Sequence, residues 1–141
     1  ERKNAEERFR IFFENEPAYC YMISPEGVII DVNKSALKTL EYKKEELVGK
    51  PLKTIYAPES LQKMKRFFKK WKKYGKINNE EMTIISKNGK RHTVILSANS
   101  VRNKKGKILH SISVQKDITE RKKIEDKLKK TIKKLRENIK K

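Results

Sequence analysis

The chain has 141 residues, of which 35% are hydrophobic and 39% are charged, and its formal net charge at pH 7 is +19. These values suit one modest domain with a helical extension, and the absence of any long apolar run excludes a membrane-spanning segment. A disulfide framework and a cysteine-based metal site are excluded too, because Cys20 is the only cysteine.

Cys20 lies in the apolar run AYCYMI, which predicts a buried structural thiol in a reducing, cytoplasmic compartment. The chain begins at Glu1 and shows no signal peptide, so we expect a piece of a longer protein and leave room for flanking domains or membrane segments. Its richness in lysine, glutamate and isoleucine indicates a thermophile-like composition.

Residues 1–16 form the first expected element, an amphipathic helix. Phe9, Phe12 and Phe13 share one face at i, i+3 and i+4. Pro17 ends the helix, because the residue before a proline disfavours helical backbone angles. We expect this aromatic stripe to be buried in the core or in a dimer interface.

Two short strands are expected at 18–23 and 28–32, joined as a hairpin. Ser24–Gly27 supplies the turn, since its proline presets φ and its glycine accepts a positive φ. Asn33 follows the second strand, where its side chain is placed to cap a helix over 35–42.

Residues 58–75 form the most strongly amphipathic helix, with lysines on one face and apolar side chains on the other. The apolar side chains are those of Leu61, Met64, Phe67, Phe68, Trp71 and Tyr74. Gly75 is the expected C-terminal cap of this helix.

Three further strands are expected at 77–86, 91–102 and 107–118, with turns at Asn88-Gly89 and at 103–106. Two strands, several helices and a three-stranded meander predict an α+β fold, in which helices pack on one face of a single antiparallel sheet. The later strands are apolar on both faces, so the second face needs the N-terminal helix or a second copy of the chain.

The end of the chain reads as a coiled coil, because apolar residues follow the 4-3-4 spacing at Leu128, Ile132, Leu135 and Ile139. Asp117–Arg121 lies where the strand pattern changes to this helix, and it supplies acceptors for the free N–H groups of a helix start. A strand joined directly to an oligomerising helix favours a sensor or relay over an enzyme.

The chain resembles a PAS domain over roughly residues 5–125. The resemblance rests on ISPEGVIIDVN at 23–33, LEYKKEELVGKPL at 40–52, an E-x-x-I-x-x-K-N-G run at 81–89 and, most specifically, G-x-I…DITERK at 106–122. It implies a five-stranded antiparallel sheet in the order 2-1-5-4-3, with helices enclosing a small pocket, and a sensory function.

We divide the chain into an N-terminal amphipathic helix (1–16), a PAS core (17–120) and a signalling coiled-coil helix (121–141). The resemblance implies a homodimer that passes a ligand- or partner-induced change to an effector outside the fragment, a histidine kinase or a cyclic-dinucleotide enzyme. The expected relay residues are Asp117, Ile118, Thr119 and Arg121, with Asp117 paired to Arg121. The expected dimer contacts are Phe9, Phe12, Phe13, Leu128, Ile132, Leu135 and Ile139.

A pocket in such a domain is lined by apolar residues of the helices and of the helix-facing side of the sheet. The expected lining is Leu40, Ile55, Tyr56, Phe68, Ile84 and Leu96, with Ser111 and Ser113 as polar contacts. A bound small-molecule ligand and an empty, purely structural core are both consistent with the sequence, and the polar residues do not name a ligand.

The family's known cofactors can be checked against single residues. Haem-binding members supply a histidine from the long helix, and residues 58–75 contain none, so haem by that route is not expected. Light-sensing members need a cysteine in a G-x-N-C-R-F motif, whereas 49–54 reads GKPLKT, which excludes a flavin–cysteinyl adduct and leaves a non-covalent ligand open. His92 is expected to be exposed at a strand start and His110 to be partly buried, and neither belongs to a metal-binding cluster.

The alternative to a sensor is a basic docking module that binds nucleic acid or an anionic membrane through 61–76 and 121–141. Residues 61–76 hold eight lysines and arginines and no acid. However, Trp71 and Phe67 share a stripe with Leu61, which favours burial in the core. Catalysis within the chain is not expected, because no catalytic triad, paired carboxylates or phosphate-binding glycine loop can be read in it.

Overall fold

A computed structural model describes residues 2–140. In chain order the elements are α1 (Arg2–Asn15), β1 (Tyr19–Ile23), β2 (Ile29–Val32), α2 (Lys34–Leu40), α3 (Lys44–Leu47), the 3-10 helices η1 (Leu52–Ile55) and η2 (Pro58–Ser60), α4 (Leu61–Tyr74), β3 (Lys76–Ile85), β4 (Arg91–Arg102), β5 (Ile108–Asp117) and α5 (Thr119–Lys140).

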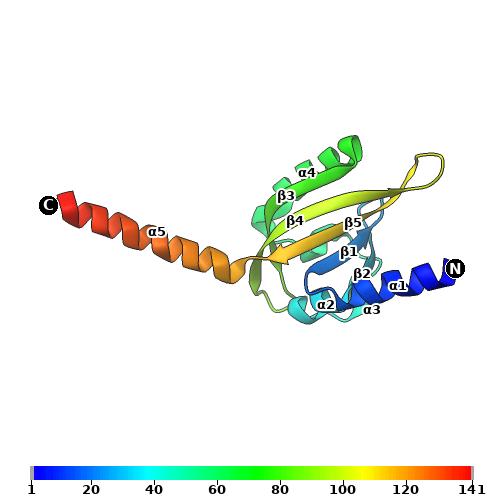
Figure 1. Cartoon of the computed structure of the whole chain (residues 1–141), viewed down its shortest axis with the longest axis horizontal. Coiled ribbons are helices and arrows are strands. Elements are labelled where there is room, and N and C mark those ends of the chain that lie inside the picture. The colour runs from blue at the N-terminus through cyan, green and yellow to red at the C-terminus, as the bar shows by residue number, and fades with distance from the viewer. Residues whose placement is uncertain (1, 141) are drawn as a thin grey trace.

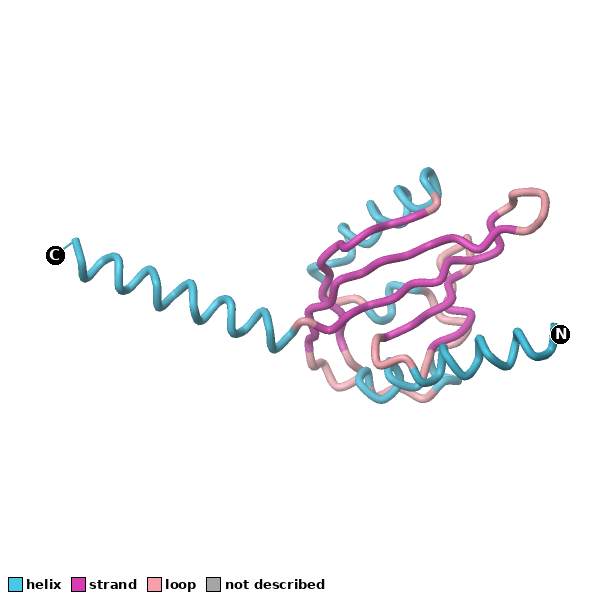
Figure 2. Tube along the Cα trace, viewed as in Figure 1, coloured by secondary structure: helices cyan, strands magenta, loops and turns pink. Residues whose placement is uncertain are grey.

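The five strands form one antiparallel sheet in the order β2-β1-β5-β4-β3 (Figure 2). This confirms the α+β fold and the 2-1-5-4-3 order that the resemblance implied. β5 lies in the centre of the sheet, where Ser113 stands opposite Tyr21 of β1 and Ala98 of β4. The central position makes β5 the strand that contacts both halves of the sheet.

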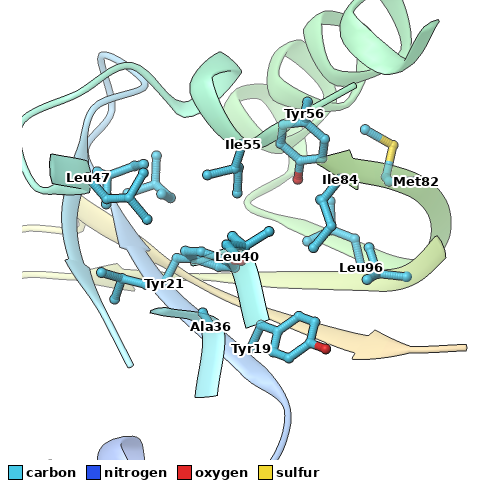
Figure 3. Packing of buried hydrophobic residues seen from close by; sticks show 14 residues of the cluster. Tyr19, Tyr21, Ala36, Leu40, Leu47, Ile55, Tyr56, Met82, Ile84 and Leu96 are labelled. Carbon is cyan, nitrogen blue, oxygen red and sulfur yellow. The ribbon is translucent and has the colours of Figure 1, made fainter. Parts of the chain in front are cut away.

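The main core lies between one face of the sheet and α2, α3, η1 and α4. Alternate residues of β1 point into it, so Tyr21 and Ile23 are buried while Met22 between them is not. Figure 3 shows Leu40 of α2 and Ile55 of η1 among the side chains that close this core. α4 runs beside β3, at the edge of the sheet opposite β2 (Figure 1).

The other face of the sheet is apolar as well, as the sequence indicates. Cys20 and Met22 of β1 lie on this face, and α1 runs past it close to Met22. Cys20 is buried, and burial raises the pKa of its thiol to about 11. The thiol is therefore neutral at pH 7, which fits the structural role expected for it.

The aromatic stripe of α1 is divided between core and solvent. Phe13 is only 2% exposed and stacks on Phe9, with 5.7 Å between the ring centroids. Phe12 is 67% exposed. Phe13, expected at a dimer interface, is instead buried within its own chain, because the end of α1 lies at the start of α2, where the N-cap residue Asn33 donates to the carbonyl of Phe13.

α5 projects away from the body as a single straight helix and contributes no buried residue (Figure 1). The four apolar residues of its 4-3-4 seam are all exposed: Leu128, Ile132, Leu135 and Ile139. Within residues 2–140 no helix has both the length and the apolar character needed to cross a membrane.

Candidate functional site

An internal cavity of about 40 Å³ lies between α4, η1 and the sheet. Its helical wall is apolar and comes mainly from Met64, Phe67 and Trp71. Its floor on β5 is polar, because Ser111, Ser113 and Gln115 point toward the helices on one face of that strand. A cavity of this size holds on the order of three water molecules, or a small organic group in their place.

Five residues expected in the lining lie in the wall of this cavity: Tyr56, Phe68, Leu96, Ser111 and Ser113. Leu40, Ile55 and Ile84 do not line it. They are fully buried in the main core (Figure 3), because α2 and η1 press directly onto the sheet and leave no space there.

Gln115 is a cavity residue that the sequence reading missed. It is 1% exposed, and its Nε2 donates a hydrogen bond to the hydroxyl of Tyr56 at 3.1 Å. Gln115 stands between Val114 and Lys116 in the sequence and was not recognised as buried. Its even spacing from Ser111 and Ser113 nevertheless places it on the same face of the strand. That period-2 spacing was the signal that could have found it.

Three residues of the lining carry buried polar atoms that have no hydrogen-bond partner within the described chain. These are the Tyr21 hydroxyl, Trp71 Nε1 and Gln115 Oε1. An unpaired buried polar group costs about 1–3 kcal/mol, so such groups favour water or a bound molecule that pairs with them. Together they offer a donor, an acceptor and a hydroxyl that can act as either.

Burial keeps the two phenols at the cavity in their neutral form. It raises the pKa of Tyr21 well above its usual value, and it raises the pKa of Tyr56 despite the hydrogen bond from Gln115. Both hydroxyls therefore act as hydrogen-bonding groups and not as charges. Among residues 2–140 no group of three or more His, Cys, Asp or Glu side chains could hold a metal ion.

The second part of the candidate site is the junction between β5 and α5. The carboxylate of Asp117 accepts hydrogen bonds from the Tyr19 hydroxyl at 2.6 Å and from the backbone N–H of Thr119 at 2.9 Å. It also lies 3.0 Å from Nδ1 of His92. Burial opposes ionisation of Asp117, but the hydrogen bonds from Thr119 and Tyr19 outweigh it and hold the carboxyl pKa below its usual value.

The remaining junction residues tie the start of α5 to β4. The backbone N–H of Ile118 donates to the carbonyl of Thr93 at 2.8 Å, and Thr119 Oγ1 accepts from the N–H of Thr93 at 3.0 Å. Ile118 is buried. The start of α5 is thus fixed to Thr93 of β4 by one backbone hydrogen bond from Ile118 and one hydrogen bond to the side chain of Thr119.

The expected pair between Asp117 and Arg121 is not formed. Arg121 Nε pairs with Glu125 Oε1 at 3.2 Å, one turn further along α5. Asp117 belongs to the strand and not to the helix, so its carboxylate faces Tyr19 and His92 instead.

His92 also differs from expectation, since it is 8% exposed and not at the surface. It alternates with the buried Val94 and Leu96 on one face of β4, and the end of β5 covers it. Its Nε2 is buried without a partner within the described residues.

β5 connects the two parts of the site. Ser111, Ser113, Gln115 and Asp117 follow each other at every second position, so the cavity floor and the junction carboxylate lie on one face of one strand. Gln115 and Asp117 are separated by about 7 Å of backbone. The cavity floor and the start of α5 are therefore joined by one continuous strand, with no loop between them.

Several solved structures resemble this chain, and some of them are PAS domains. The PAS domain of a protein from Colwellia psychrerythraea matches with a TM-score of 0.74 and 18% identity over 82% of this chain and 98% of that one. A domain of a sensor histidine kinase/response regulator from Geobacter sulfurreducens matches with a TM-score of 0.68 and 18% identity, over 83% of this chain and 97% of that one. An RNA-binding Light-Oxygen-Voltage receptor matches with a TM-score of 0.80 and 14% identity, over 98% of this chain but 39% of that one.

At these identities the likeness concerns the fold alone. No curated protein sequence matches the chain at a significant level. The sequence profile of the PAS domain family, however, matches residues 17–120, which is most of the chain. Together with the sheet order, the cavity under α4 and the strand–helix junction, this match shows that the chain belongs to the PAS domain family.

Proposed function

We propose that this PAS domain is a dimeric sensory module that binds a small molecule in the cavity under α4. The bound state is passed through α5 to an effector domain, such as a histidine kinase or a cyclic-dinucleotide enzyme. The observation that carries the proposal is the continuity of β5, whose one face holds both the cavity floor and Asp117.

The polar groups of the cavity support ligand binding. Trp71 Nε1 and Gln115 Oε1 need a hydrogen-bond partner, since each buried orphan costs stability, and a ligand that displaces water from the cavity can supply it. A small molecule with one hydrogen-bonding group could pair with Gln115 and alter its bond to Tyr56. That change would act on β5 two residues before Asp117.

The junction supports the relay. Asp117 holds β1 through Tyr19, β4 through His92 and the first turn of α5 through Thr119. A shift of β5 would change three contacts at once, at the residue where the helix starts. The similar domain from a sensor histidine kinase, and the exposed seam of α5, favour a partnered helix as the output. We place the module in the cytoplasm.

Native mass spectrometry of the purified domain tests the proposal, because it reports bound small molecules and dimerisation together. We expect a dimer mass with a copurified molecule or one acquired from a metabolite extract. Ser113→Leu, which fills the cavity floor, should abolish the added mass. Ser97→Leu, on the opposite face of the sheet, should retain it. A domain that acquires no molecule from any extract would refute ligand sensing.

The alternative of nucleic-acid docking has less support from the side chains of α4. Trp71 is buried and stacks on Phe68 at 5.9 Å, so its ring is not free to stack on a base. The exposed face offers lysines and Arg66, which contact phosphates without reading sequence. Similarity to an RNA-binding receptor concerns the fold. A gel shift with single-stranded RNA that persists at about 200 mM salt would favour this alternative.

A further inference from the structure

A second hollow adjoins the cavity and bears on the chemistry of its ligand. This groove, of about 420 Å³, lies on the outer side of α4, between α4, η1 and the β1–β2 turn. Leu52, Met64 and Phe68 line both the groove and the internal cavity. Only these three apolar side chains are shared, so they mark the place where a molecule in the groove could extend into the cavity.

The groove is strongly cationic. Its charged residues are Lys53, Lys65, Arg66 and Lys69 against the single carboxylate of Glu26. All four cations are exposed, and none takes part in an ion pair among residues 2–140.

Some cations elsewhere on the surface do have partners. On the same helix Lys70 pairs with Glu80, and near α3 Lys44 pairs with Asp31. The groove gathers four cations without ion-pair partners among the described residues beside the apolar side chains that it shares with the cavity, which favours an anion that also carries an apolar part.

The cavity behind these shared side chains is different again. There the unpartnered Trp71 Nε1 and Gln115 Oε1 offer hydrogen bonds within apolar walls. From the groove to the cavity, the lining side chains are therefore first cationic, then apolar, and finally hydrogen-bonding. A molecule matched to this sequence has an anionic head, a short apolar body and room for one polar group at its far end.

We propose that the ligand of this domain is a small amphiphilic carboxylate. Its carboxylate rests in the groove beside Lys65 and Arg66, and its apolar body passes between Leu52 and Met64 into the cavity. This inference rests on the proposed sensory function, and it adds the ligand's charge and the direction from which it enters. An acidic protein segment could use the same cations, but it would leave the cavity empty.

Trp71 allows the two occupants to be distinguished. It is the only tryptophan in the chain, and it lines the cavity but not the groove. Its fluorescence therefore reports entry into the cavity and responds little to a molecule that stays outside.

The test compares three probes with the same six-carbon chain and different charge: hexanoate, 1-hexanol and hexylammonium. Each is titrated into the 141-residue domain at low ionic strength while the fluorescence of Trp71 and the heat of binding are measured. We expect hexanoate to change the fluorescence and to bind about tenfold more tightly than hexylammonium, because the groove attracts one head group and repels the other.

Variants of the groove provide the decisive comparison. The double variant Lys65→Gln/Arg66→Gln should weaken hexanoate about threefold to tenfold, as expected for two exposed ion pairs, and leave 1-hexanol unchanged. The matched double variant Lys73→Gln/Lys76→Gln removes the same charge outside the groove. It should leave the binding of both probes within about twofold of the original.

Three results would overturn the inference. Hexylammonium that binds as tightly as hexanoate would exclude an anion-selective site. If 1-hexanol still changed the Trp71 fluorescence in that case, the proposed sensory function would remain supported. Heat of binding without a change in Trp71 fluorescence would confine hexanoate to the groove. The absence of binding by all three probes would also refute the proposal of a carboxylate ligand. The metabolite-extract experiment would then test the sensory function separately.

Discussion

Asn33 joins three segments of the fold through one fully buried side chain. Its Oδ1 accepts from the N–H of Ala36 at 3.2 Å, which caps α2, and from the N–H of Cys20 at 3.1 Å. Its Nδ2 donates to the carbonyls of Phe13 and Ala18 at 3.0 and 2.9 Å. The cap could be read from the sequence, but the clamp on the end of α1 could not.

The donor half of Asn33 can be tested separately from the cap. Asn33→Asp keeps the capping oxygen but loses the donor and places a carboxylate beside backbone carbonyls. We expect the free energy of unfolding to fall by about 3 kcal/mol or more. Urea denaturation measures this loss. Asn99→Asp, at an exposed position, should change it by less than about 0.5 kcal/mol, and equal losses in both variants would contradict the clamp.

Asp117 should make the stability of the domain sensitive to acid. Its carboxyl pKa is lowered in the folded state, so its stabilisation is complete above the ordinary value of about 4 and is lost as pH falls below it. Asp117→Asn should lower the unfolding free energy by about 1–3 kcal/mol at pH 7, and by progressively less as the pH falls below about 4.

Urea denaturation at about pH 7 and about pH 3 checks the prediction for Asp117. Asp126→Asn on the exposed surface of α5 is the control, and it should have little effect at either pH. A destabilisation by Asp117→Asn that is the same at pH 7 and pH 3 would show that the carboxylate charge is not what stabilises the junction.

At the scale of elements, the strands and turns were predictable because their signals are local. Asn88-Gly89 and Ser24–Gly27 encode their turns within four residues, and alternation marks the strands. The burial of His92 could not be predicted from local sequence. It depends on contact with Asp117, which lies 25 residues later in the chain at the end of a neighbouring strand.

The cavity was predictable only in part for a related reason. Side-chain type identified Tyr56 and Phe68 as core-facing residues of the helical layer, but it could not tell which apolar residues border empty space. Leu40 and Ile84 differ from them only in how closely α2 and the sheet approach each other. That distance is a property of the whole packing arrangement, and no sequence window contains it.

α1 offers a prediction from one pair of neighbouring phenylalanines. Phe13→Ala should cost about 3–5 kcal/mol of unfolding free energy, because it leaves a cavity in a buried contact. Phe12→Ala, at an exposed position, should change the unfolding free energy by less than about 0.5 kcal/mol. Thermal or urea unfolding of the two variants separates the roles, and similar losses would contradict the division of the stripe.

For the molecule as a whole, apolar exposure is concentrated on the two terminal helices. Ile11 and Phe12 of α1 and the seam of α5 are exposed in the single chain. α5 carries ten basic and four acidic residues, a net charge of +6, so two parallel copies repel each other while their seams attract. Dimerisation should therefore depend on salt in a defined direction.

We expect the dimer dissociation constant to fall as salt rises from about 20 to 500 mM, because screening weakens the repulsion between the two copies of α5. Ile132→Gln should weaken the dimer at every salt concentration, and Thr131→Gln, one position outside the seam, should not. Sedimentation at several salt concentrations measures both effects. A dimer that weakens with added salt would point to an interface held by opposite charges elsewhere.

The way α5 leaves the body has a mechanical consequence. Its 22 residues make a rod of about 33 Å that is held to the sheet only by its first turn (Figure 1). A tilt of about 5° at Thr119 would move the far end of such a rod by about 3 Å. In the proposed relay, a displacement of β5 at Asp117 too small to disturb the sheet would therefore be enlarged, at the far end of α5, to the size of a side-chain contact.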